Sequence, residues 1–170
     1  SFFKKIMKIF KAILIIFLTN TLLQAEEVIM DKNTFIKKAL NVNEVPMHSY
    51  IILKEEIEEG VTNILEDTYH LPVIKYWKSG NKVAFILEAI GKHEFITTGY
   101  VVENQKILDT KVLVYRENYG YEIKYDYFLN QIRGNTLKGN GKLTNRIANI
   151  SGATMSVNSM RKLSKLSLFL

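Results

Sequence analysis

The sequence predicts an α+β domain in which an antiparallel sheet of four or more strands is flanked by helices. Two features of the hydrophobic pattern support this prediction. Residues 73–116 contain four short runs rich in β-branched and aromatic residues, whereas the segments before and after them repeat apolar residues at helical spacing. The 170 residues are enough for one domain with a hydrophobic core of its own.

Four strands are predicted in the middle of the chain, and each is followed by a short turn signal. They cover residues 73–77, 82–89, 94–102 and 107–116. Connections this short join antiparallel neighbours, so the strands are expected to form a meander. The second strand has Phe85 and Leu87 on one face and Ala84 and Ile86 on the other. Apolar residues on both faces predict a central strand that is covered on both sides.

Helices are predicted at residues 31–40, 53–66 and 125–132, and from Ala153 towards the C-terminus. Asp31 or Asn33 is a candidate cap for the first helix. Each helix has apolar side chains at helical spacing that we expect to be buried. They are Phe35, Ile36 and Leu40; Ile57, Val61, Ile64 and Leu65; Phe128, Leu129 and Ile132; and Val157, Met160, Leu163 and Leu166.

The first 25 residues have the pattern of a secretory signal peptide. Four lysines and no acidic residue accompany an apolar run at residues 12–18, and Ala25 precedes an acidic pair. That run is too short for a membrane span, although an uncleaved anchor remains the alternative. We expect residues 1–25 to be a signal peptide, with Met7 as a candidate start. Residues 26–170 would then form a single domain in the periplasm or on the outer face of the cytoplasmic membrane.

Charge and composition exclude several classes of function. Without residues 1–25 the formal net charge falls from +6 to +2. This argues against nucleic-acid binding, which requires a clustered basic surface. The absence of cysteine excludes disulfides and thiolate metal sites. His48, His70 and His93 lack the short spacing of metal ligands, so no metal is predicted.

Residues 151–154, with the sequence Ser-Gly-Ala-Thr, are predicted to lie where a loop meets the start of the last helix. A helix start has unpaired backbone N–H groups and the positive end of the helix dipole, and both stabilise a phosphate. Gly152 allows the backbone to approach a phosphate closely, and Thr154 and Ser156 add hydroxyl groups. The tetrapeptide alone also fits a common alternative, in which a hydroxyl caps the helix.

Residues 150–156 resemble the flavinylation motif of the FMN-binding domain family. This family includes flavin-carrying subunits of Rnf-type and sodium-pumping respiratory complexes and many small secreted domains. Residues 112–123 are similar to the strand and turn that precede the flavin helix in this family, and residues 128–134 to the short helix after that turn. Residues 85–92, together with Ile96, Thr97 and Gly99, are similar to the start of the sheet in the small secreted members. The resemblance spans most of the chain beyond the signal segment.

The resemblance implies that a flavin transferase takes FMN from FAD and joins it, through its phosphate, to Thr154. It implies an electron carrier with a membrane or periplasmic redox partner, and not a stand-alone enzyme. Four residues are expected around the phosphate: Ser151, Gly152, Ala153 and Ser156. Three more are expected in the turn beside the flavin: Glu117, Tyr119 and Gly120.

Three positions, in two segments, depart from the family pattern. Ala148 stands where the motif usually has an aspartate, and Asn149 offers a polar side chain one position later. Asn118 and Tyr119 stand where the small secreted members tend to have serine and arginine. Two alternatives therefore remain open. One is a protein that binds FMN without a covalent bond, including a small flavin reductase, and the other is a binding or sensory module without a cofactor.

Several other residues also have two interpretations. Tyr119 or Tyr121 could form an aromatic wall for a flavin ring, or could belong to ordinary packing. Glu117 could lie beside the flavin, or could pair with Arg116 or Lys124 at the surface. The basic last helix could contact acidic lipids or an acidic partner, or could serve only to pack its apolar side onto the sheet.

Overall fold

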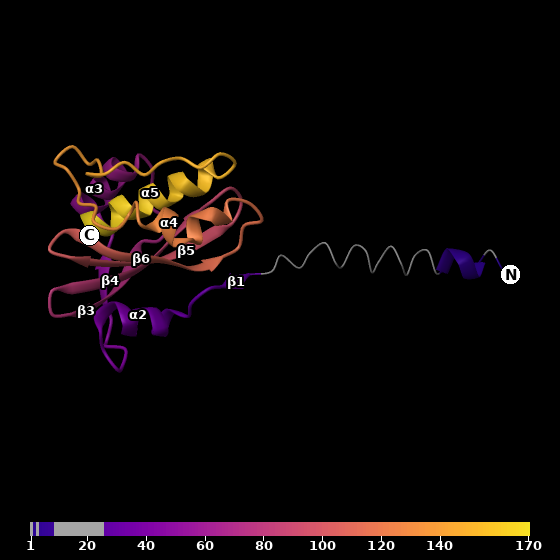
Figure 1. The fold of residues 1–170 in the computed structure, drawn as a ribbon, viewed down its shortest axis with the longest axis horizontal. Helices are drawn as coiled ribbons and strands as arrows, with labels where there is room; N and C mark the ends of the chain where they lie inside the picture. Colours follow the sequence, from indigo (N-terminus) through magenta and orange to yellow (C-terminus); the bar gives the residue numbers. More distant parts are fainter. Residues whose placement is uncertain (1, 3, 9–25) are drawn as a thin grey trace.

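The computed structural model describes residues 2, 4–8 and 26–170 (Figure 1). Apart from residues 2 and 4–8, the predicted signal peptide lies outside the described residues. Among the residues that are described, no helix combines the length and the apolar character needed to cross a membrane. The domain is an α+β structure in which a six-stranded antiparallel sheet packs against helices, so the predicted fold class is confirmed.

The sheet has the strand order β1-β6-β5-β4-β3-β2. The strands are β1 (Glu27–Val28), β2 (Ser49–Ile52), β3 (Val73–Ser79), β4 (Lys82–Ile90), β5 (Phe95–Glu103) and β6 (Lys106–Tyr115). Strands β3 to β6 are neighbours in chain order and correspond to the four predicted strands, which confirms the antiparallel meander. The sequence does not predict β1 and β2, because two and four residues are too few to show an alternating pattern.

Helices cover both faces of the sheet (Figure 1). On one face lies α2 (Lys32–Leu40), and on the other lie α3 (Glu55–Leu65), the short α4 (Asp126–Leu129) and α5 (Thr154–Phe169). The predicted cap of α2 is confirmed, because the backbone N–H of Thr34 donates to Asp31 Oδ1 at 3.0 Å.

Two of the predicted helices differ from the observed ones. Helix α3 begins two residues later than predicted. Its N-terminal half does not reach the core: Ile57 is 41% exposed, whereas the buried residues of α3, Val61 and Leu65, lie in the C-terminal half. Helix α4 ends at Leu129, and the chain continues in tight turns whose bonds span three residues, such as Ile132 N to Leu129 O. The predicted burial of Phe128, Leu129 and Ile132 is nevertheless confirmed.

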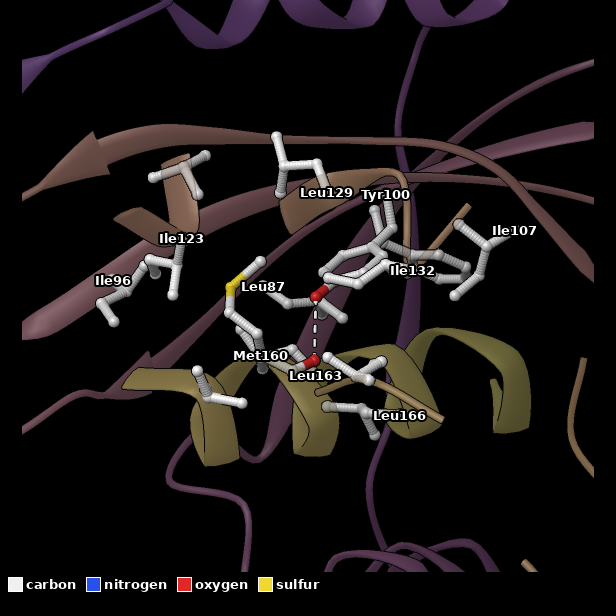
Figure 2. Packing of buried hydrophobic residues seen from close by; sticks show 14 of the residues in the cluster. Leu87, Ile96, Tyr100, Ile107, Ile123, Leu129, Ile132, Met160, Leu163 and Leu166 are labelled. Carbon is white, nitrogen blue, oxygen red and sulfur yellow. Dashed lines mark hydrogen bonds between the residues drawn. The ribbon is translucent and has the colours of Figure 1, made fainter. Parts of the chain in front are cut away.

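The larger of two hydrophobic clusters lies between α5 and the sheet (Figure 2). The four apolar residues predicted to face the sheet from the last helix, Val157, Met160, Leu163 and Leu166, are all buried. At the centre, the buried Tyr100 hydroxyl of β5 donates to Met160 O at 3.3 Å. A smaller cluster on the opposite face packs Phe35 of α2 against Ala84 and Val101. Since β4 contributes to both clusters, the prediction of a central strand covered on both faces is confirmed.

Candidate functional site

The predicted phosphate site lies at the start of α5, where a tight turn leads into the helix. Gly152 has a φ of +82°, a left-handed conformation that favours glycine, and Ala153 N donates to Ile150 O at 3.0 Å. The helix begins at Thr154, and its first turn is closed by Val157 N donating to Ala153 O at 2.9 Å. Within the described residues no side chain caps this helix, so the alternative of a hydroxyl cap is wrong. Backbone N–H groups at the start of α5 therefore remain available to an anion.

Thr154 is exposed at this helix start, and so are Ser151 and Gly152. The Oγ1 of Thr154 accepts a hydrogen bond from Asn149 Nδ2 at 2.9 Å. Asn149 thus provides a polar contact to the threonine hydroxyl. Ala148 instead contributes its backbone, because its N–H donates to Gln131 Oε1 at 2.7 Å.

The structure brings the predicted turn residue Gly120 against the start of α5. A Cβ added to Gly120 would lie 2.8 Å from Ser156 Oγ and 3.3 Å from Ala153 Cβ, and the φ of Gly120 is +81°. Both Ala153 and Ser156 are buried. Ala153 and Ser156 therefore pack the helix start against the Gly120 turn, whereas Ser151, Gly152 and Thr154 form its accessible surface.

Tyr115 holds this turn in place. Its hydroxyl donates to the carbonyl of Tyr119, and its burial raises its pKa to about 12, so it stays a neutral donor at physiological pH. The Tyr119 ring itself is 68% exposed and has Lys92 Nζ 5.7 Å from its centroid. Tyr121 is half exposed and lies edge-on to Tyr125. Both residues flank Gly120, which lies against the start of α5 although it is distant from Thr154 in the chain.

Glu117 is buried and supports a neighbouring hairpin. Its Oε1 accepts hydrogen bonds from His93 N at 2.5 Å and Glu94 N at 3.0 Å, in the turn between β4 and β5. The two cations considered as its surface partners have other acids: Arg116 pairs with Glu26 at 3.2 Å and Lys124 with Glu27 at 2.6 Å. Glu117 therefore shapes the hairpin that borders the site.

The sequence did not predict a groove of about 340 Å³ that lies beside Thr154. Residues from the first half of α5, the connection between α3 and β3, and the β4–β5 hairpin line this groove. Three aromatic rings form one wall: the centroids of Tyr69 and His70 are 4.7 Å apart, and those of His70 and Phe95 are 4.8 Å apart. Met155, which follows Thr154 directly, also lines it. We call it the aromatic groove.

Polar side chains also line the aromatic groove, among them Glu88, Asn158 and Ser159. Lys162 Nζ and Asp67 Oδ2 form an ion pair at 2.9 Å, and the hydrogen bond from Lys162 lowers the pKa of Asp67. Burial lowers the pKa of His70, which favours its neutral form, although the charge of Glu88 acts in the opposite direction. The wall that Tyr69, His70 and Phe95 present to a ligand is therefore mainly apolar and uncharged. The only hint of it in the sequence is the Tyr-His pair before β3.

Within the described part of the chain, no three His, Asp or Glu side chains lie close enough together to hold a metal ion. Comparisons with family models, curated proteins and solved structures find no match for this chain.

Proposed function

We propose that this protein is an exported electron-transfer protein that carries FMN joined through its phosphate to Thr154. The observation that carries this proposal is an exposed threonine hydroxyl at an uncapped helix start, directly beside an aromatic groove. The sequence motif supplies the identity of the cofactor, and the pattern of residues 1–25 supplies the export. The proposed partners are a flavin transferase and a membrane or periplasmic redox protein.

The start of α5 suits the phosphate of FMN. The N–H groups of its first turn and the positive end of its dipole favour an anion, and Gly152 leaves the approach open. In the attachment step, Thr154 Oγ1 forms a bond to the phosphorus atom of the FMN half of FAD. The diphosphate bond breaks, and AMP leaves with the proton of the hydroxyl. Asn149, which bonds to Oγ1, orients the hydroxyl before this step.

The aromatic groove suits the flavin ring. Tyr69, His70 and Phe95 offer a wall of aromatic rings, tilted by 56° and 40° from one to the next, and the groove begins one residue after the attachment point. Bound there, FMN would supply the capacity to accept and pass on electrons. The protein would hold the ring and limit its contact with water, and the ion pair of Lys162 with Asp67 lies at the side of the groove.

Mass spectrometry of the protein produced together with a flavin transferase tests the covalent bond. We expect the peptide containing Thr154 to gain the mass of FMN less one water. The gain should be lost in Thr154→Ala and kept in Ser151→Ala, which removes a neighbouring exposed hydroxyl. Circular dichroism of both variants checks that the fold is retained. An unmodified peptide from wild-type protein, with the transferase shown to act on another substrate, would contradict covalent attachment.

The aromatic groove also favours a second candidate, a protein that binds FMN without a covalent bond or acts as a small flavin reductase. The groove does not depend on the ester, so a ring could bind there alone. A yellow native protein whose Thr154 peptide is unmodified would support this candidate. A colourless protein that takes up no FMN, even with the transferase, would favour a binding or sensory module instead.

A further inference from the structure

A second groove, on the outer side of α5, has only cationic charged side chains. It measures about 310 Å³, and its charged residues are Lys142, Arg146, Arg161 and Lys165. We call these four residues the basic groove. Lys142 and Arg146 are exposed, and Arg161 and Lys165 are half exposed. Residues 26–170 carry a formal charge of only +2, so the basic groove is a local concentration of charge.

The cations of the basic groove differ from those that pair with a carboxylate. A few cations elsewhere in the domain do pair with a carboxylate: Lys162 of α5 pairs with Asp67, and Arg133 pairs with Asp109. Within the described residues, no ion pair joins any of the four cations of the basic groove to a carboxylate. Their charge is therefore available to an anionic partner.

Arg161 and Lys165 are held in place by neutral acceptors. The Arg161 guanidinium donates from Nε and Nη2 to Ile147 O, at 3.2 and 2.5 Å, and from Nη1 to Asn158 Oδ1 at 2.8 Å. Lys165 Nζ donates to Ile64 O at 3.4 Å. These bonds fix the position of each side chain and leave its positive charge intact, so a partner that binds there orders few side chains.

The basic groove lies on the same stripe of α5 as Thr154. Residues 154, 158, 161 and 165 follow the four-three-four spacing that places side chains on one helix face. Arg161 is seven residues from Thr154, which is about 10 Å along the helix axis. The loop that contributes Lys142 and Arg146 also contributes Asn149, which bonds to Thr154. A partner that covers the basic groove therefore lies next to the start of α5.

We propose that the basic groove docks the domain onto an anionic lipid surface. A protein partner would take most of its binding energy from aromatic or apolar anchors. Among the described residues, the apolar side chains that line the basic groove are the half-buried Leu143 and the buried Ile147, so the groove presents no fully exposed apolar side chain as an anchor. Anionic headgroups require no such anchor, because each Lys or Arg near the surface adds its own electrostatic contribution. The proposal concerns the protein alone and holds with or without a flavin.

Sedimentation of the full chain, without flavin, with lipid vesicles tests this proposal. The vesicles contain equal parts of phosphatidylglycerol and phosphatidylcholine, or phosphatidylcholine alone, at low ionic strength. The test variant is Lys142→Gln with Arg146→Gln, which removes two exposed cations whose side chains bond to no other described residue. The matched control is Lys32→Gln with Lys38→Gln, which removes two exposed lysines from α2 on the opposite face of the sheet (Figure 1).

We expect the affinity for anionic vesicles to fall about fivefold per cation removed, and so about 25-fold in the Lys142/Arg146 variant. The Lys32/Lys38 variant should bind within about twofold of wild type, because α2 faces away from the lipid. Equal losses in the two variants, or equal binding of wild type to both kinds of vesicle, would overturn the proposal. Binding to soluble polyglutamate that needs Lys142 and Arg146, without binding to lipid, would also overturn it, in favour of an acidic protein partner.

Discussion

The two faces of the sheet are covered to very different depths. On one face, α3, α4, α5 and the loop between α4 and α5 bury a continuous cluster that includes Tyr100, Phe128 and Met160. On the other face, the nine residues of α2 bury a much smaller cluster around Phe35. The candidate site belongs entirely to the first face, since Thr154, the aromatic groove and the basic groove all involve α5.

The α5 face of the sheet therefore has the larger part of the hydrophobic core, and the α2 face has the smaller part. A modification site needs neighbours that hold its geometry, and α5 meets that need because its inner side is buried along the helix. Helix α2 has only Phe35, Ile36 and Leu40 in the core, so fewer contacts oppose its opening. We expect changes on the α5 face to unfold the whole domain, and changes on the α2 face to act more locally.

The largest effect is expected from Met160→Ala. Met160 is fully buried, accepts the Tyr100 hydroxyl bond at its carbonyl and packs at the centre of the larger cluster (Figure 2). The cavity left behind should lower the free energy of unfolding by about 2–5 kcal/mol in urea denaturation. Met155→Ala, which removes the same side chain from an exposed position on the same helix, should change it by less than about 0.5 kcal/mol. Equal losses in the two variants would contradict the assignment of the core.

A smaller effect is expected from Gly99→Ala on the α2 face. A Cβ at Gly99 would overlap the outer edge of the Phe35 ring, so this ring must shift, and we expect α2 to shift with it. We expect a loss of about 1–3 kcal/mol, with hydrogen exchange becoming faster in α2 than in α5. Gly139→Ala is the matched control, because no atom lies within 4 Å of its added Cβ. If exchange quickens equally in both helices, the two faces do not differ as described.

The third prediction concerns the stability of the domain at alkaline pH, which depends on the burial of Tyr69 on the α5 face. Burial raises the pKa of Tyr69 from 10.0 to about 12, so the folded state favours the protonated phenol. The stability this provides is complete below pH 10 and is lost as the pH rises towards 12, since the unfolded chain releases that proton first. Tyr69 alone should account for on the order of 2 kcal/mol of the wild-type loss through this window, and Tyr69→Phe should lack that part of the decline.

Thermal unfolding at a series of pH values measures this difference. Tyr50→Phe, at an exposed position on β2, should follow the wild-type curve. Parallel curves for wild type and Tyr69→Phe would show that Tyr69 is more accessible than the structure indicates.

Much of the fold follows from local pattern. The apolar residues on both sides of β4 predict its central position, and the three-residue repeat from Val157 to Leu166 predicts the buried side of α5. Strand β2 escapes prediction because it is too short for its pattern to stand out. Its residues become a strand by pairing with β3, for example Ile51 opposite Ile74.

The candidate site also has parts that follow from the local sequence and parts that depend on tertiary packing. The glycine turn and the helix start at Thr154 could be inferred from adjacent residues, because a helix terminus is a local structure. The aromatic groove could not, since Tyr69 and His70, Phe95 and Met155 come from three distant segments that only the packing of α5 on the sheet brings together. The role of Glu117 is likewise tertiary, because its carboxylate reaches backbone N–H groups more than twenty residues away. The backbone geometry of a turn or a helix start depends on a few adjacent residues. The walls of a groove depend on which distant segments come into contact when the hydrophobic core packs.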